Sequence, residues 1–255
     1  MPFRLNPDYL ARYLASNGIV VPPNMNFETW EPVYEAILAD FGYDREADER
    51  ARDVLYDLLD ETETYDPANL DLDGATVAVA GAGPSLERDL SLVRSADAVV
   101  AASTAADRLR EHGCAVDCLV TDLDKQGETV VSLTEAGVPV VAHAHGDNVD
   151  MIREMVPKIN PEMIVPTTQA APAPPVRNFG GFTDGDRAAF LADYLGAAKL
   201  TFPGWDFEDS SVEPEKARKL RWAERLLYWL EWRRSDQFAV LDGRREAIDT
   251  SPLLV

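Results

Sequence analysis

The sequence is poor in the residues that cross-link small secreted domains or build structural metal sites. Among its 255 residues it has two cysteines and three histidines. These numbers exclude a disulfide framework and a cysteine-based zinc site. Cys114 and Cys118 both lie in or beside an apolar run, so we expect two buried free thiols.

Long apolar runs are also missing. No stretch approaches the roughly 20 apolar residues that a membrane-spanning helix needs. The first residues lead into polar sequence without the apolar segment of a signal peptide. We therefore expect a soluble, cytoplasmic protein with no membrane partner.

Basic residues, and lysine above all, are scarce. The chain has 45 acidic and 24 basic residues, of which 5 are Lys and 19 are Arg, and its formal net charge is −21. The acidic residues are spread along the whole chain, which favours a halophilic protein, because the Debye length is only about 3 Å at 1 M salt. So negative a chain is also expected to have no nucleic acid partner.

A chain of 255 residues can form one large α/β domain with additions or two small domains, and its hydrophobic content of 46% is sufficient for a sizeable core. Apolar residues at helical spacing predict a helical N-terminal region over residues 1–73, in which we find packing patterns and no chemistry. Its helices are expected at residues 8–14, 26–40 and 44–61. The α/β nucleotide-binding catalytic core is expected at residues 74–210, and a C-terminal helix and tail that pack on it at residues 211–255.

Within the core, short apolar runs alternate with helical stretches. Strands are predicted at residues 75–80, 97–102, 118–121, 139–143, 163–167 and 199–202. Helices are predicted at residues 86–94, 105–111, 128–136, 149–155 and 184–195, and a last one at 214–234. Near-continuous apolar strands separated by helices indicate a doubly wound, mostly parallel sheet with helices on both faces.

Polar, Gly-rich or acidic residues follow nearly every predicted strand. In sheets of this kind, ligands bind outside the carboxyl ends of the strands. The segments at those ends are residues 81–85, 103–104, 121–124, 143–148, 167–169 and 204–206. We therefore expect the functional site at this edge of the sheet.

Asp122 and Asp124 are the central pair at this edge. Carboxylates this close repel each other unless a cation or water separates them, and the two would face one side if the strand conformation continued. Mg²⁺ takes one or two carboxylates together with substrate phosphates. An acidic turn that only closes the strand is the alternative, because short motifs are weak evidence when isolated.

The segment 81–85 (Gly-Ala-Gly-Pro-Ser) lies between a predicted strand and a predicted helix, so its backbone N–H groups could hold phosphate at the helix N-terminus. Position 86 is Leu, where a dinucleotide fingerprint has Gly or Ala, and the Gly-Lys-Ser/Thr ending of a P-loop is missing. We favour a nucleotide phosphate loop of another type. A plain tight turn is the alternative.

His143 and His145 lie two residues apart at a predicted strand end and precede Asp147 and Asn148. No third ligand stands at zinc spacing, and histidine beside carboxylate is equally suited to proton transfer or hydrogen bonding. This pattern favours contacts to substrate or phosphate, with Asp147 near the metal.

The segment 180–187 combines a Gly-rich approach with Thr183, Asp184, Asp186 and Arg187. The Arg187 guanidinium is suited to bidentate contact with phosphate. Thr183 or Asp184 would also make a good helix N-cap, which explains one of these residues but not the set. Three acidic clusters and a phosphate loop favour metal-assisted phosphoryl transfer.

The predicted C-terminal helix carries two of the five lysines in a basic cluster, Lys216, Arg218, Lys219 and Arg221. The cluster either holds a triphosphate or is a solvated helix face. Trp222, Leu226, Trp229 and Arg233 follow at spacings of four, three and four. This stripe indicates a packing face, within the chain or shared with a second subunit in a homodimer.

Four motifs, in this order, resemble those of the archaeal 6-hydroxymethyl-7,8-dihydropterin pyrophosphokinase family. They are residues 81–86 (GAGPSL), 121–124 (TDLD), 143–148 (HAHGDN) and 181–187 (GFTDGDR). The resemblance covers residues 75–235. The core of that family is similar to the catalytic domain of thiamine pyrophosphokinase, whose Asp-rich loops bind Mg²⁺ and ATP.

The resemblance implies ATP as co-substrate, Mg²⁺ as cofactor and a reduced pterin alcohol as acceptor, with AMP released, for tetrahydromethanopterin or folate-type coenzyme synthesis. The patterns and the resemblance together assign Asp122, Asp124, Asp147, Asp184 and Arg187 to catalysis, with Asp122, Asp124 and Asp147 as metal ligands. They assign the binding of nucleotide and metal to Gly81, Gly83, Pro84, Ser85, Ser103, Thr104, His145, Asn148, Thr183 and Asp186. The general base is unassigned.

Two other classes of function share some of these features. A nucleotide-sugar glycosyltransferase also uses Asp-x-Asp with a divalent metal, and would release a nucleoside diphosphate from a sugar donor. A non-catalytic nucleotide-binding module would bind ATP without turnover.

Overall fold

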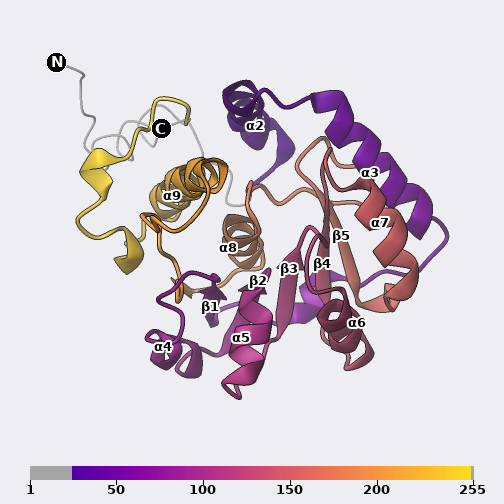
Figure 1. Ribbon diagram of the computed structural model, residues 1–255, viewed down its shortest axis with the longest axis horizontal. Coiled ribbons are helices and arrows are strands. Elements are labelled where there is room, and N and C mark those ends of the chain that lie inside the picture. Colours follow the sequence, from indigo (N-terminus) through magenta and orange to yellow (C-terminus); the bar gives the residue numbers. More distant parts are fainter. Residues whose placement is uncertain (1–24, 254–255) are drawn as a thin grey trace.

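The computed structural model describes residues 25–253, and their centre is a six-stranded, all-parallel sheet (Figure 1). The strands are β1 (Thr76–Ala80), β2 (Ala98–Ala102), β3 (Cys118–Thr121), β4 (Val140–Ala144), β5 (Ile164–Thr168) and β6 (Lys199–Thr201). Their order across the sheet is β5-β4-β3-β2-β1-β6. The apolar strands are buried on both faces, as expected for a parallel sheet covered by helices, and the predicted fold class is confirmed.

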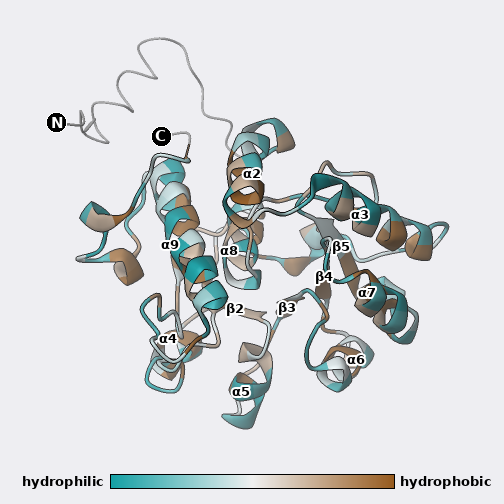
Figure 2. Cartoon of the chain, turned by 45° about the horizontal axis from the view of Figure 1, so that its top comes forward, coloured by the Kyte–Doolittle hydropathy of each residue, from teal (hydrophilic) through white to brown (hydrophobic). Residues whose placement is uncertain are grey.

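Helices cover the two faces of the sheet as separate layers. One layer contains α3 (Arg45–Leu59), α4 (Leu90–Arg94), α5 (Ala105–Glu111), α6 (Gly127–Glu135) and α7 (Val149–Met155). The other contains α2 (Phe27–Phe41), α8 (Asp184–Tyr194) and α9 (Pro214–Arg234). These helices carry both hydrophilic and hydrophobic residues (Figure 2), the pattern of helices that bury one face and expose the other.

The two N-terminal helices of the described chain each begin after a capping side chain. The Asn26 side chain accepts a hydrogen bond from the Thr29 N–H, and the Asp44 side chain accepts one from the Glu46 N–H. These helices are α2 and α3, predicted at 26–40 and 44–61. The helix predicted at 8–14 lies outside the described residues.

The α9 stripe is a packing face within the chain. Trp222, Leu226 and Trp229 are buried, and Trp229 stacks on Trp30 of α2 at a centroid distance of 6.5 Å. α2 and α9 therefore lie together on one face of the sheet. Both cysteines are free and buried, as predicted. No helix among residues 25–253 is long and apolar enough to cross a membrane.

The strand order reverses between β1 and β6. From β1 the chain advances strand by strand to β5, and α8 then returns it to place β6 on the other side of β1. The loops that follow β1 and β6 therefore meet: the Gly81 N–H donates to the Pro203 carbonyl at 2.9 Å, and the Gly83 N–H donates to the Gly204 carbonyl at 2.8 Å. A crevice at such a reversal is where doubly wound sheets bind ligands.

Several element bounds differ from the prediction, and the largest difference is at α4. This helix begins at Leu90 and not at residue 86, because residues 84–89 form successive turns in which the Leu86 N–H bonds the Gly83 carbonyl. Short 3₁₀ turns account for other irregular segments. They are η1 (Pro67–Leu70), η2 (Val156–Lys158), η3 (Pro161–Met163), η4 (Ala239–Leu241) and η5 (Arg245–Ala247).

Gly181, just before α8, is held in a conformation that only glycine adopts readily. Its φ is +92°, and a Cβ there would lie 2.6 Å from the Arg187 Cα. At Gly137, φ is +80° but a Cβ would meet nothing within 4 Å. We expect Gly137→Ala to cost about 1 kcal/mol of unfolding free energy for the left-handed backbone alone. Gly181→Ala should cost about 2 kcal/mol more, because the backbone at Arg187 must move to make room for the Cβ. Equal losses of unfolding free energy in the two variants, measured by urea denaturation, would contradict this prediction.

Candidate active site

A cavity of about 600 Å³ lies at the carboxyl ends of the strands. Loops after several strands line it, together with the first turn of α8, one side of α9 and the α2–α3 connection. The predicted site residues that line it are Gly81, Gly83, Ser103, Thr104, Asp122, Asp124, His145, Asp147, Thr183, Asp184 and Arg187. The structure thus brings together three acidic clusters that are far apart in the sequence.

Asp122 and Asp124 line this cavity from a turn that follows β3. The strand ends at Thr121, whose Oγ1 accepts the Leu123 N–H at 3.0 Å, and Leu123 has a positive φ of 66°. The Asp124 N–H donates to Asp122 Oδ1 at 3.3 Å. The strand conformation therefore does not continue through the pair, and the two carboxylates reach one cavity through a tight turn.

The pKa values of the two carboxyl groups are shifted in opposite directions. Burial alone would raise the pKa of Asp122, but hydrogen bonds from His145 and Asp124, with the charge of Arg187, hold that pKa well below its usual range. Burial and the neighbouring Asp122 raise the pKa of Asp124. Asp122 is therefore a fixed negative charge beside a carboxyl group that is more easily protonated.

The β4 loop supports Asp122 from one side. His145 Nε2 lies 3.5 Å from Asp122 Oδ2. Asn148 does not line the cavity, contrary to its predicted contact with ligand. Its amide nitrogen donates to the carbonyls of Asp122 and His143, at 2.7 Å each, and its oxygen accepts the His145 N–H at 3.0 Å. Asn148 therefore holds the β3 and β4 loops together.

His143 is buried and is not among the residues that line the cavity. Its Nδ1 lies 3.0 Å from Thr167 Oγ1. Burial, with the charge of Arg187, lowers the pKa of His143 well below its ordinary value, so the ring is neutral. Of the two histidines, only His145 faces the cavity.

The first turn of α8 brings Asp184 and Arg187 to the cavity. Arg187 Nη1 donates to Asp184 Oδ1 at 3.1 Å, and both side chains are largely buried. Burial, followed by the negative charge of Asp122, raises the pKa of Asp184 to about 7, although Arg187 opposes the shift. Asp184 therefore keeps its proton to a higher pH than an exposed aspartate, even beside Arg187.

Asp186, predicted to bind nucleotide or metal, is a helix cap. It is fully buried, and its carboxylate accepts the Thr183 N–H at 3.0 Å and the Thr183 hydroxyl at 2.6 Å, and also the Phe182 N–H. These bonds satisfy donors at the start of α8, as in a capping box. Three residues after the N-cap, the side chain points back to the backbone and not to the cavity.

The loop at residues 81–85 is not a free phosphate cradle. The N–H groups of Gly81 and Gly83 bond the β6 loop, and the Ser85 N–H donates to Asp206 Oδ2 at 2.8 Å. Pro84 and Ser85 do not line the cavity. A Cβ at Gly81 would lie 2.6 Å from the Gly204 carbonyl oxygen, so this glycine permits close approach of two loops.

Two parts of the cavity wall lie outside the residues assigned to the site from sequence. Lys216 and Lys219 of α9 line the cavity, a position consistent with the triphosphate interpretation of that basic cluster. Asp48 of α3 also lines it, although the N-terminal helices were expected to carry no chemistry. The available signal was spacing: Asp48 lies three residues before Ala51, in line with the buried Leu55 and Leu59, so an acid occupies a buried position of the helix.

Magnesium fits the donors at one side of this cavity. Within residues 25–253, no three His, Cys, Asp or Glu side chains are gathered as a complete metal site, so the predicted set of Asp122, Asp124 and Asp147 is not preassembled. Mg²⁺ binds through one or two carboxylates and completes its shell with water and phosphate oxygens. The oxygen ligands of Asp122 and Asp124 meet that requirement.

Comparison with known proteins gives consistent matches. The model of the MptE-like family, described as 6-hydroxymethylpterin diphosphokinase MptE-like, matches residues 54–211. Proteins from Methanothermobacter thermautotrophicus and Pyrococcus furiosus are each 38% identical over 224 residues, which cover 81% of this chain and 96% and 95% of theirs. One from Methanocaldococcus jannaschii is 31% identical over 232 residues, covering 81% of this chain and 96% of its own. All three are named 6-hydroxymethyl-7,8-dihydropterin pyrophosphokinase.

Proposed function

The chain belongs to the MptE-like family of 6-hydroxymethylpterin diphosphokinases, and on this basis we propose that it transfers diphosphate from ATP to 6-hydroxymethyl-7,8-dihydropterin. In this reaction the oxygen of the pterin alcohol attacks the β-phosphorus of ATP. The bond between that phosphorus and the oxygen bridging to the α-phosphorus breaks, and AMP leaves. The alcohol proton is released, and the product serves a tetrahydromethanopterin or folate-type coenzyme.

The observation that supports this proposal most strongly is the convergence of Asp122, Asp124, Asp184 and Arg187 on one cavity. A triphosphate is strongly negative, and carboxylates alone would repel it. In the proposed complex, Asp122 and Asp124 hold Mg²⁺, with Asp147 nearby at the same cavity. When bound, Mg²⁺ would neutralise charge that develops on the phosphate oxygens during transfer.

The chain's own groups supply the positioning in this proposal. His145 and Asn148 fix Asp122 and its loop. Arg187 uses Nη1 for Asp184 and Nη2 for Gln169. Each of these nitrogens carries a second hydrogen, which remains for a phosphate oxygen in bidentate fashion. Lys216 and Lys219 of α9 also line the cavity and place further positive charge there.

The proposal is tested by incubating the purified protein with ATP, Mg²⁺ and the reduced pterin alcohol at high salt and separating the nucleotides. We expect AMP and pterin diphosphate in equal amounts, and no AMP without the pterin. Thiamine and a sugar alcohol serve as alternative acceptors. Release of ADP, or of neither nucleotide, would contradict the proposal.

A further inference from the structure

Asp48 on α3 is a buried carboxylate at the cavity wall that the proposed chemistry does not use. Its side chain is enclosed, with 3% of the residue exposed, and it accepts three hydrogen bonds. Tyr34 Oη and Gln169 Nε2 donate to Oδ2 at 2.7 and 2.8 Å, and the Gly146 N–H donates to Oδ1 at 2.7 Å. Donors from α2, from the loop after β4 and from the loop after β5 therefore converge on one carboxyl group.

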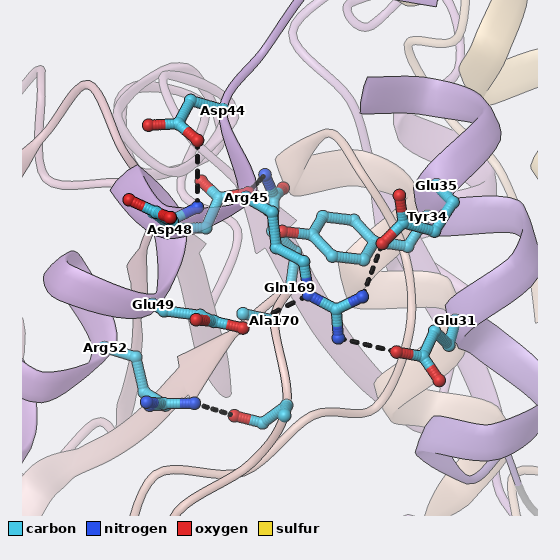
Figure 3. A network of polar contacts seen from close by, with 12 residues as sticks. Glu31, Tyr34, Glu35, Asp44, Arg45, Asp48, Glu49, Arg52, Gln169 and Ala170 are labelled. Atoms are coloured by element: carbon cyan, nitrogen blue, oxygen red, sulfur yellow. Dashed lines mark hydrogen bonds and ion pairs between the residues drawn. The ribbon is translucent and has the colours of Figure 1, made fainter. Parts of the chain in front are cut away.

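Ion pairs of the neighbouring Arg45 hold α3, the helix that carries Asp48, against α2 (Figure 3). Arg45 joins α2 to α3, because it pairs with Glu31 and Glu35 of α2 and with Glu49 of α3. Burial, with the hydrogen bond to Asp48, raises the pKa of Tyr34, so the phenol keeps its proton and remains a donor.

Gln169, directly after β5, connects Asp48 to the active site. Its backbone carbonyl accepts from Trp30 Nε1 at 3.0 Å and from Asn178 Nδ2 at 2.9 Å. Its Nε2 donates to Asp48, while its Oε1 accepts from Arg187 Nη2 at 3.2 Å. Because a carboxylate only accepts and a guanidinium only donates, the amide fits between them in one orientation.

The polar chain thus runs from Asp48 through Gln169 and Arg187 to Asp184. A second branch runs through Gly146, which lies between His145 and Asp147 in the β4 loop. A Cβ at Gly146 would lie 2.7 Å from the Ala47 Cβ, so this loop packs closely against α3. One carboxylate therefore anchors both the α8 and the β4 sides of the cavity.

We infer that Asp48 is a positioning residue for diphosphate transfer: through the Gln169 amide it fixes the guanidinium of Arg187 in the orientation that meets the phosphates. This inference rests on the role proposed above for Arg187. It gives the N-terminal helical region a part in the reaction, although Asp48 lies outside the residues matched by the family model.

The alternation of donors and acceptors from Asp48 through Gln169 to Arg187 provides a specific test. In Asp48→Asn, an amide N–H₂ can face Gln169, which then turns its oxygen toward residue 48 and its own N–H₂ toward Arg187. Two donors facing each other displace the guanidinium. In Gln169→Glu, two carboxylates face each other. In the double variant Asp48→Asn/Gln169→Glu, the new amide at position 48 donates to one oxygen of the new carboxylate at position 169. Arg187 donates to the other oxygen, so donors and acceptors alternate again.

We expect each single variant to lower kcat/KM by about 100-fold, the effect of a small misplacement of a positioning group, and the double variant to recover to within about tenfold of the wild type. Glu49→Gln is the matched control, since Glu49 is on the same helix and contacts Arg45 but not Gln169. It should keep wild-type kcat/KM. Melting temperatures of all variants separate lost positioning from unfolding.

A double variant as inactive as the worse single variant, or single variants as active as wild type, would overturn the inference. So would recovery of melting temperature without recovery of kcat/KM, because that pattern is purely structural. A wild-type protein that releases no AMP would reject the proposed function itself. An active wild type without rescue rejects only the positioning role.

Discussion

Asp122→Asn is expected to remove nearly all diphosphate transfer. Hydrogen bonds from His145 and Asp124 maintain a negative charge on Asp122. The asparagine amide is neutral, so the site attracts Mg²⁺ less strongly. Charge stabilisation by a bound metal is worth several kcal/mol, and each 1.36 kcal/mol is a factor of ten. We therefore expect kcat to fall by about 10³-fold, measured as AMP release at saturating ATP and pterin.

Asp209→Asn provides the control for this prediction. Asp209 lines the same cavity but is on the β6 side, where its carboxylate accepts hydrogen bonds from Ser211. The variant should keep kcat within a few-fold and leave the Mg²⁺ dependence unchanged. Equal loss of activity in both variants, or an equal requirement of both for excess Mg²⁺, would show that Asp122 has no special role.

Asp184→Asn is expected to lose activity and gain stability. Burial and the charge of Asp122 raise the pKa of Asp184 from 3.8 to about 7. Below pH 4 the carboxyl is protonated in both states and there is no penalty. As the pH rises from 4 to 7, the unfolded chain releases this proton first, so the folded state loses stability, and above pH 7 the penalty is complete.

An asparagine at this position escapes that penalty. In the absence of metal and nucleotide, we expect Asp184→Asn to be more stable than the wild type by up to about 4 kcal/mol at pH 8, at 1.36 kcal/mol per pKa unit. The difference should vanish near pH 4. Urea denaturation at the two pH values measures it.

The same variant should lower kcat by about 100-fold, the order of loss when one preorganised electrostatic group is removed. Arg187 then loses its ion-pair partner, one of the two contacts that orient its guanidinium. Gain of stability with loss of activity is typical of a carboxylate retained for function at a cost in stability. Equal stability of both proteins at pH 8 would contradict the raised pKa.

The parallel sheet could be predicted because its strands are continuous apolar runs. The predicted bounds of β3 and α9 are the observed ones, Cys118–Thr121 and Pro214–Arg234. The rule that ligands bind at the carboxyl ends of parallel strands then located the cavity. The local sequence pattern was sufficient to predict a feature wherever a single helix or strand determines that feature.

Features that depend on partners from distant segments could not be predicted. The N–H groups after β1 bond the β6 loop, and the adjacency of these strands is a property of the sheet order. Asp184 and Asp186 look alike in sequence, but the start of α8 turns one to the cavity and the other to the backbone. Asp48 and Gln169 are 121 residues apart, so no local motif contains both.

The measurement that tests the central claim most directly is a crystal structure with Mn²⁺ in place of Mg²⁺ and the α,β-methylene analogue of ATP, which cannot release AMP. Anomalous scattering locates the metal without ambiguity. We predict a Mn²⁺ peak at bonding distance, roughly 2.1 Å, from a carboxylate oxygen of Asp122 or Asp124, with Arg187 on a phosphate. A metal–nucleotide complex bound elsewhere, away from Asp122, Asp124 and Asp184, would contradict the account.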